Sequence, residues 1–457
     1  MPAYRVRYVR GVALAVVALA LCAAAGVALA GAPSRVAGTI NVWVVPEGAD
    51  AMHDLAQAFM RDYPSVRVQV TPLSWEILYA RILQDVSAGT GAFDVATWDV
   101  MTAGSVARGM LDLEQFGRQN PDLILPGHDP SDFDPVAWRT AGLWEGKNIG
   151  FPFYLNTMFL YYRKDLFNDP NLKSQFRQKY GYELVVPDTW GKARDVSEFF
   201  TRRNNPSSPT EYGIALMFPR THTTFYEFLL FFGPYRRSDA GMKKFGPISF
   251  EYGDYFTGDL KPAFDSPEGV AAINTIKSLL PFSPDPLGSD YGETIEYFAR
   301  GLVAMVPQWG AAWASFKAAE ALQPADQRVG VALIPGGHSV SGNWGLGVNA
   351  SSRNQPAAFL FAQYATSKVA DKGKFLKFGL LPTRTSTLND PQVKAADPRM
   401  AVLGQIVATQ THRPRIPEEP RLEDVAVGTF TEILLGSVAP EQGLRQLAQE
   451  WTKILGR

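Results

Sequence analysis

The chain has 457 residues, of which 46% are hydrophobic and 19% are charged, a composition that excludes a disordered protein. Its length exceeds what one ordinary hydrophobic core supports, so two lobes are expected. The formal net charge of −1 gives no indication of nucleic-acid binding. Aromatic residues reach 12%, including 10 Trp, which is enough to line a pocket as well as a core.

Residues 1–30 have the features of a secretory signal. Arg5, Arg7 and Arg10 precede an uncharged apolar run that ends in a small-x-small cleavage pattern. A retained membrane anchor is the alternative, because the run is about long enough to span a bilayer. Cleavage after Ala30 predicts an exported protein, either periplasmic or at the outer face of the cell membrane.

Cys22 is the only cysteine of the chain. The stretch "LALC" resembles a lipoprotein box, in which Cys22 would carry lipid and become the first mature residue. Leu21 departs from the small residue usual before that Cys, and the alternative is a small apolar residue inside the signal. In both cases the folded part has no disulfide and no cysteine–metal site.

Strands and helices alternate along the first hundred residues after the signal. Apolar, β-branched runs predict strands at 39–45, 65–75 and 93–99, each followed by a stretch with helical periodicity. This pattern predicts an α/β lobe with a mostly parallel sheet, whose ligand would bind at the carboxyl ends of the strands. Those ends carry Glu47, Trp75, Trp98 and Asp99.

Strands and helices also alternate in the rest of the chain, but less regularly. Thr189 or Asp188 caps one predicted helix, and Ser266 caps another. The segment 225–265 is rich in Gly and aromatic residues and yields no clear element. The Pro- and charge-rich segment 412–425 is predicted to be a solvated loop that leads into a helix.

Several segments in series carry a family resemblance. They are "GFPFYLNTMFLYYRKDLF" (150–167), "PDTWGKA" (187–193), "YFARGLVAMVPQWG" (297–310), "GNWGLGVNASSRNQPAAFLFAQYATS" (342–367) and "FGLLPTRTS" (378–386). Each is a weak match alone, but they occur in family order. Together they resemble the extracellular solute-binding proteins of carbohydrate ABC importers, the maltose-binding-protein-like family.

The resemblance implies a periplasmic-binding-protein fold: two α/β lobes, a hinge of crossing strands and a cleft that closes around sugar. It implies crossings near 149–153, 302–307 and 345–349. After the signal peptide 1–30, the first lobe would comprise 38–150 plus 308–345, and the second 151–307 plus 346–457.

The resemblance also implies the function. The protein would be the substrate-binding component of an ABC transporter, not an enzyme, and would deliver a di- or oligosaccharide to membrane permease subunits. It implies a monomer that needs no cofactor and no metal and binds no nucleic acid.

A sugar presents an apolar face that stacks on aromatic rings and a rim of hydroxyls that bind fixed polar groups. The family match favours four rings for the apolar faces: Trp98, Tyr154, Trp309 and Trp344. Gly310 is expected to leave space beside Trp309. Core packing is the alternative for every one of these rings, and it is favoured for Trp43, Trp75 and Trp313.

Four polar residues complete the predicted site. Asp99 and Glu47 would accept hydroxyl hydrogen bonds, although each could instead serve a helix N-terminus. Asn156 follows the first crossover, and a turn amide is its alternative. Arg384 would donate paired hydrogen bonds to sugar hydroxyls or pair with Asp99 across the cleft, and a surface ion pair is its alternative.

Two other functions stay open at this stage. The same fold could bind a non-sugar such as a glycerol phosphodiester, with Arg384 facing the phosphate. A secreted carbohydrate-active enzyme is the other possibility, because carboxylate pairs are common in a chain with 45 acidic residues. No nucleophile elbow, phosphate-binding loop or histidine spacing for zinc supports an enzyme.

Overall fold

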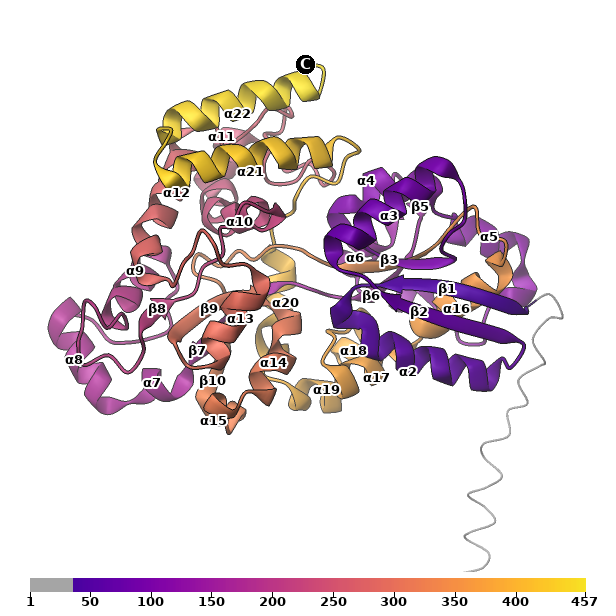
Figure 1. Ribbon diagram of the computed structural model, residues 1–457, viewed down its shortest axis with the longest axis horizontal. Helices are drawn as coiled ribbons and strands as arrows, with labels where there is room; N and C mark the ends of the chain where they lie inside the picture. Colours follow the sequence, from indigo (N-terminus) through magenta and orange to yellow (C-terminus); the bar gives the residue numbers. More distant parts are fainter. Residues whose placement is uncertain (1–35) are drawn as a thin grey trace, which may run out of the picture.

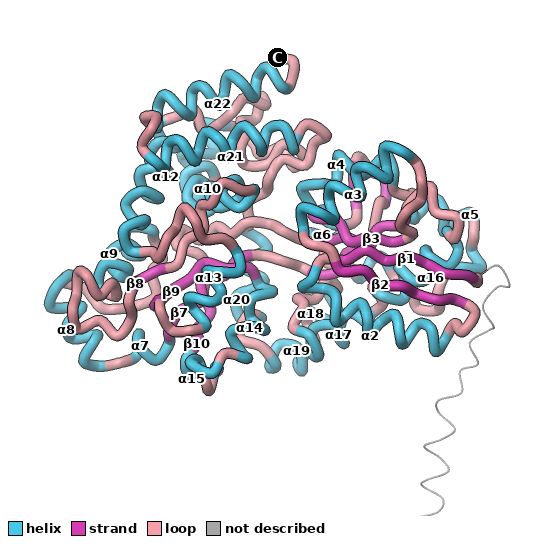
Figure 2. Tube along the Cα trace, in the orientation of Figure 1, coloured by secondary structure: helices cyan, strands magenta, loops and turns pink. Residues whose placement is uncertain are grey.

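The computed structural model describes residues 36–457, so the signal sequence and the lipidation of Cys22 lie outside the described residues. Two lobes lie side by side, each built around its own β-sheet (Figure 1). Helices surround both sheets (Figure 2). Within residues 36–457, no helix is long and apolar enough to cross a membrane.

The first lobe contains a five-stranded sheet in the order β2-β1-β3-β11-β6. Its strands are β1 Gly38–Val44, β2 Val66–Pro72, β3 Val95–Asp99, β6 Phe151–Tyr154 and β11 Trp344–Val348, and a separate small hairpin consists of β4 Leu143–Trp144 and β5 Lys147–Asn148. Its helices are α2 Pro46–Asp62, α3 Trp75–Ala88, α4 Ala103–Val106, α5 Leu113–Gln119, α6 Pro135–Ala141, α16 Gln355–Ala365, α17 Lys368–Phe378 and α18 Thr385–Leu388.

The second lobe contains a four-stranded sheet in the order β10-β7-β9-β8. Its strands are β7 Met158–Arg163, β8 Tyr212–Ile214, β9 Val303–Trp309 and β10 Val329–Ala332. Its helices are α7 Lys164–Asn168, α8 Pro170–Tyr180, α9 Trp190–Phe199, α10 His222–Arg236, α11 Asp239–Phe245, α12 Pro267–Leu279, α13 Tyr291–Ala299, α14 Trp313–Ala318, α15 Ala325–Arg328, α20 Met400–Thr409, α21 Glu419–Leu435 and α22 Pro440–Ile454, and α19 Pro391–Ala396 connects α18 to α20.

The strand predictions from apolar patterning are confirmed where the strands are central. β1 buries every second side chain, because only one face of this strand meets the core, whereas β3 and β9 are buried along their whole length. Two predicted caps are also confirmed: Thr189 accepts a hydrogen bond at the start of α9, and Ser266 does so at α12. β1 pairs in parallel with β2 and β3, while β11 is antiparallel to both of its neighbours.

Three segments lie side by side where the lobes meet. Residue Thr157 forms a bridge with Ser341, and Val340 forms one with Thr411. The Thr157 hydroxyl is 2.8 Å from the Ser339 hydroxyl, and the Ser339 hydroxyl accepts a hydrogen bond from the backbone of Met158. This hydrogen-bonded group of segments is the hinge.

The predicted crossings at 302–307 and 345–349 are wrong, because those residues lie inside strands. Residues 302–307 lead into and form most of β9, and 345–349 coincide with β11. The chain crosses instead at 155–157, between β10 and β11, and between α18 and α20. The predicted lobe boundaries shift accordingly, since β10 belongs to the second sheet, while β11 belongs to the first sheet and α16 contacts it.

The segment that the sequence left unassigned consists of most of α10, then α11 and a long loop. The loop packs on the chain just after the hinge, where the backbone of Arg415 donates to the Glu251 carbonyl. The Arg415 guanidinium in turn donates to two backbone carbonyls of the first lobe, those of Arg139 and Leu143. The stretch around Arg415 therefore connects both lobes, and the prediction of a solvated loop is wrong for this part of 412–425.

Candidate functional site

A cavity of about 320 Å³ lies between the lobes beside the hinge. Both lobes and the hinge contribute to its wall. The first lobe supplies Val45, Pro46, Glu47, Ser74, Trp75, Glu76, Asp99, Tyr154 and Asn156; the second lobe supplies His222, Thr223, Tyr226, Asp290, Tyr291, Gly292 and Trp309; Gly342, Trp344 and Arg413 lie in or next to the hinge.

The first-lobe residues meet here because of the sheet topology. β1, β2 and β3 run parallel, so their carboxyl ends open at the same edge of the sheet. Glu47 stands in the first turn of α2, Trp75 opens α3, and Asp99 ends β3. These three positions were predicted to be strand ends, and the structure brings them together. The core packing favoured for Trp75 is therefore wrong, because its partly exposed ring lines the cavity.

Trp344 and Tyr154 form an aromatic wall on the hinge side. Trp344 begins β11 and is paired with both Asp99 and Tyr154 across the sheet. The ring centroids of Trp344 and Tyr154 are 6.1 Å apart, with an interplanar angle of 18°. Their exposed fractions are only 5% and 2%, so the two rings are largely enclosed and show limited surface to the cavity.

Trp309 contributes a ring from the second lobe to the cavity wall, at the end of β9. Its ring packs edge-to-face against Tyr226 of α10 at 5.1 Å, a favourable aromatic geometry. The expectation that Gly310 leaves room for this ring is wrong, because a side chain at Gly310 would meet Leu381 and Phe159. Gly342 provides the room instead: a Cβ there would lie 2.6 Å from the indole.

A second aromatic pair connects the lobes across the cavity. The Trp75 indole of the first lobe stacks on the His222 ring of the second, with centroids 4.3 Å apart and an angle of 11°. Burial and the nearby charge of Arg413 lower the pKa of His222. The ring is therefore neutral at pH 7 and serves as a flat surface rather than as a cation.

The Asp99 carboxylate is fixed by three donors. The Arg413 guanidinium donates to both of its oxygens, at 2.9 and 3.2 Å, and the Trp75 indole N–H donates at 3.2 Å. The backbone N–H of Met101 also donates to it at 3.4 Å, so the helix-capping alternative holds alongside its position in the cavity. Arg413 is the cation opposite Asp99, the place that the sequence assigned to Arg384.

Asn156 and Glu47 present acceptors without a side-chain partner. The backbone of Asn156 is held on both sides: its N–H donates to the Asn343 side chain, and its carbonyl accepts from Gly342. Its side-chain oxygen has no hydrogen-bond partner among residues 36–457. Burial raises the pKa of Glu47, and the charge of Glu76 adds to that effect.

Trp98 lies outside the cavity, contrary to the prediction. Successive side chains of a strand point to opposite faces, so Trp98 cannot share a direction with Asp99. Its ring is 1% exposed and packs on β11, where a Cβ at Gly345 would approach it to 2.5 Å. The core-packing alternative is therefore the observed one.

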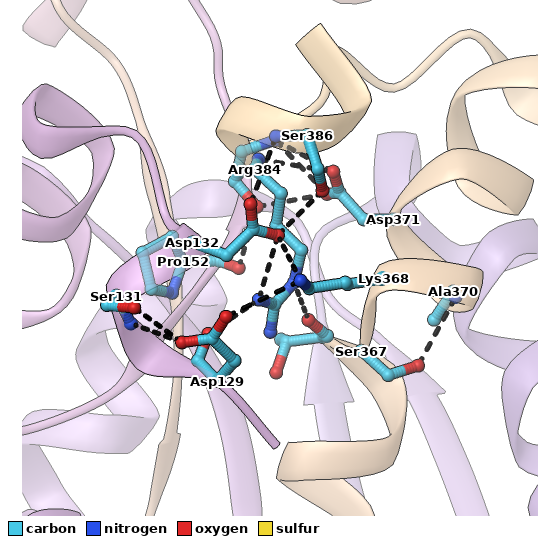
Figure 3. A network of polar contacts seen from close by, with 12 residues as sticks. Asp129, Ser131, Asp132, Pro152, Ser367, Lys368, Ala370, Asp371, Arg384 and Ser386 are labelled. Carbon is cyan, nitrogen blue, oxygen red and sulfur yellow. Dashed lines mark hydrogen bonds and ion pairs between the residues drawn. The ribbon is translucent and has the colours of Figure 1, made fainter. Parts of the chain in front are cut away.

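Arg384 also lies elsewhere, so the predicted pairing with Asp99 is wrong. Its guanidinium donates to the carbonyls of Thr366 and Asp129, at 2.7 and 2.9 Å, and is 3.5 Å from the Asp132 carboxylate (Figure 3). The side chain is 1% exposed. It holds the 129–132 loop against the end of α16, a structural position within the first lobe.

Sequence reasoning missed most second-lobe residues of the cavity. His222 and Tyr226 are four apart, a spacing that places both on one face of a helix, and this was the available signal. Asp290 and Tyr291 begin α13, where the capping box identifies a helix start but not a cavity. Arg413 gave no local signal, because only the bridge between Val340 and Thr411 brings its segment to the hinge.

This arrangement is suited to binding rather than to catalysis. Flat rings alternate with fixed carboxylate, amide and guanidinium groups, which is the wall that a polyhydroxylated ring requires. Within residues 36–457, no group of three His, Cys, Asp or Glu side chains is arranged to hold a metal ion.

The comparisons with known proteins agree with this geometry. Residues 45–372 match the family described as bacterial extracellular solute-binding protein. The chain belongs to this family. Members of the family are binding proteins that act outside the cell, and the family resemblance predicted from the sequence motifs is confirmed.

The related proteins span nearly the whole chain. A probable ABC transporter-binding protein of Deinococcus radiodurans is 23% identical and covers 86% of this chain and 87% of its own length. A mannitol-binding protein of Pseudomonas aeruginosa is 25% identical and covers 89% of this chain and 90% of its own length.

Solved structures of solute-binding proteins share the fold. Maltose-bound MalE3 of T. maritima superimposes with a TM-score of 0.74 at 22% identity, covering 90% of this chain and 98% of its own. A D-mannitol-bound ABC transporter solute-binding protein of Agrobacterium vitis has a TM-score of 0.70 at 21% identity, covering 92% and 98%. These likenesses confirm the predicted two-lobe fold.

Proposed function

We propose that this solute-binding protein captures a carbohydrate or polyol in the cavity between its lobes and delivers it to an ABC permease. The observation that carries this proposal is the composition of the cavity wall. Rings from both lobes face a space that also contains the side chains of Glu47, Asp99 and Asn156. A ligand that touches both lobes stabilises the closed form and so drives closure.

The size of the cavity favours a compact solute. Its volume of about 320 Å³ lies at the lower end of the range for ligand pockets, about 300–1,000 Å³. A neighbouring opening of about 740 Å³ shares Pro46, Glu47 and Tyr291 with it. A disaccharide would fill the inner cavity, and further sugar units would extend past Glu47 and Tyr291 into this opening.

A ligand panel tests the proposal directly. Residues 31–457 would be screened by thermal shift with disaccharides, oligosaccharides and polyols, and each hit would be measured by calorimetry. Trp309→Ala should weaken binding of every hit by about tenfold or more, because the ring supplies a stacking face. The control Trp138→Ala removes an indole that does not line the cavity and should leave affinity unchanged.

If no compound of the panel binds, or if Trp309→Ala leaves the affinity for a hit unchanged, the result contradicts the proposal. Thermal unfolding of both variants separates a loss of binding from a loss of fold. The proposal includes export through the predicted signal sequence, with a lipid anchor at Cys22 as an option. Mass spectrometry of the mature N-terminus distinguishes an acylated Cys22 from cleavage after Ala30.

A further inference from the structure

The cavity wall has an uneven charge. Four carboxylates line it, those of Glu47, Glu76, Asp99 and Asp290, against one guanidinium, that of Arg413. Lysine is absent from its lining residues. Since His222 is neutral, the cavity holds a clear excess of negative charge, whereas a site that only binds hydroxyls needs no such excess.

The single guanidinium is already engaged. Arg413 donates to both oxygens of Asp99 and to the Ser341 carbonyl, and only 2% of its side chain is exposed. A bound anion would have to compete with Asp99 for this group. Phosphate or carboxylate groups of a solute would therefore face carboxylates without a free cation to bind them.

Two of the four carboxylates are also satisfied by the protein. Asp99 is paired with Arg413. Asp290 accepts hydrogen bonds from the hydroxyls of Thr221 and Thr223, at 2.9 and 2.6 Å, and caps α13. Glu76, which is 65% exposed, lies 3.9 Å from the neutral His222 ring. Glu47 has no ion-pair partner among residues 36–457, so it is the unpaired acid of the inner wall.

Aromatic rings stand next to this unpaired acid. Glu47 and Tyr291 line both the cavity and the neighbouring opening, and a Cβ at Gly48, the residue after Glu47, would lie 3.9 Å from the Tyr154 ring. Tyr154 comes from the first lobe and Tyr291 from the second. Aromatic faces around a carboxylate form an environment that favours a cation over a neutral group.

We propose that the solute carries a positively charged amino group, which binds at Glu47 between Tyr154 and Tyr291. Its chemical class is an amino-substituted sugar or cyclitol, with the amine at Glu47 and the ring against Trp309 and Trp344. This inference rests on the proposed function, because it specifies the substrate of the same cavity. It also argues against the phosphodiester alternative raised by the sequence.

Matched solutes that differ only in charge test the inference. Glucosamine, glucose and glucuronate, together with disaccharides carrying the same three substitutions, would be measured by calorimetry at pH 7. The amino form should bind at least about tenfold more tightly than the neutral form, and the acidic form should bind more weakly than both. High salt should reduce the amino preference, because the attraction is electrostatic.

Glu47→Gln assigns the preference to one residue. It keeps the shape and the hydrogen-bonding atoms of the side chain but removes the charge, so the ratio of amino to neutral affinity should fall towards one. The control Asp54→Asn removes a carboxylate from the same helix outside the cavity and should keep the wild-type ratio.

The outcomes separate this inference from the proposed function. If neutral sugars bind and the amino forms gain nothing, or if Glu47→Gln leaves the ratio unchanged, the inference is wrong while the proposed function stands. If the acidic form binds as tightly as the amino form, the inference is also wrong and the proposed function stands. If no sugar binds in any of the three charge forms and no polyol of the panel binds either, the proposed function fails with it.

Discussion

At the scale of single residues, the cavity depends on small side chains as much as on large ones. Gly342 lies in the hinge, and its missing side chain is what allows the Trp309 ring to stand where it does. The backbone of Gly342 is also held, since its N–H donates to the Asn156 carbonyl. An indole at a strand end becomes part of a binding wall only because a glycine faces it.

Gly342→Ala should therefore reduce ligand affinity by about tenfold or more, because the new Cβ pushes the indole out of position. Calorimetry with the best hit of the panel measures the loss, and tryptophan fluorescence reports the displaced ring. The matched control is Gly428→Ala in α21, where a Cβ meets nothing within 4 Å. That change should leave affinity intact and add about 0.5–1 kcal/mol of stability. Unchanged affinity in Gly342→Ala would contradict the assignment of Trp309 to the wall.

At the scale of elements, α21 begins with an unusual pair of acids, of which Glu419 is buried and Glu423 is partly buried. Glu419 and Glu423 stand one turn apart at its start, and neither oxygen of Glu419 has a hydrogen-bond partner among the described residues. Burial raises the pKa of both, to about 7 for Glu423. The two carboxyl groups are therefore protonated at pH values at which a glutamate of the unfolded chain has already ionised.

This pair makes stability depend on pH with a definite sign. Between pH 4.5 and about 7 the folded state binds more protons than the unfolded state, so the free energy of unfolding falls as pH rises through this window. Glu423→Gln removes the part of this loss that comes from Glu423 and leaves the part that comes from Glu419. The variant should match the wild type at pH 4 and be more stable by about 3 kcal/mol at pH 8. Denaturant unfolding at both pH values measures this, with the exposed Glu432→Gln on the same helix as control. A pH-independent difference would contradict the pKa assignment.

The secondary-structure elements also show which parts of the cavity could be predicted from the sequence. Strand ends such as Asp99 and Trp309 were recognisable, because apolar runs stop abruptly at a polar residue or a glycine. The sequence did not indicate that Arg413 and Tyr291 reach the cavity, because only the tertiary fold brings their segments to it. The failures at Trp98 and Arg384 have different origins: Trp98 points away from Asp99 because side chains alternate along a strand, whereas Arg384 was placed by a family motif that carries no information on its partners.

At the scale of the whole molecule, the pair of Asp99 and Arg413 joins segments more than 300 residues apart. Both side chains are nearly inaccessible, with exposed fractions of 8% and 2%. Removing one partner from such a pair leaves an uncompensated charge, which typically costs about 3–5 kcal/mol. The attachment of the post-hinge segment to the first lobe thus depends on both residues together.

A double-mutant cycle tests this coupling. Arg413→Met should destabilise the protein by about 3–5 kcal/mol, and adding Asp99→Asn should recover part of that loss. Chemical denaturation of the two single variants and the double variant gives the coupling energy. The exposed pair of Glu114 and Arg118 serves as the control and should show less than about 1 kcal/mol. Additive effects at Asp99 and Arg413 would contradict a direct interaction.

The strand order has a consequence for synthesis. β11 lies between β3 and β6 in the first sheet, although it begins only at Trp344. When the nascent chain has been synthesised as far as β6, it still lacks β11, the strand that connects β3 to β6 in this sheet. The first lobe therefore cannot complete its fold until β11 has left the ribosome, so its sheet stays incomplete during most of translation.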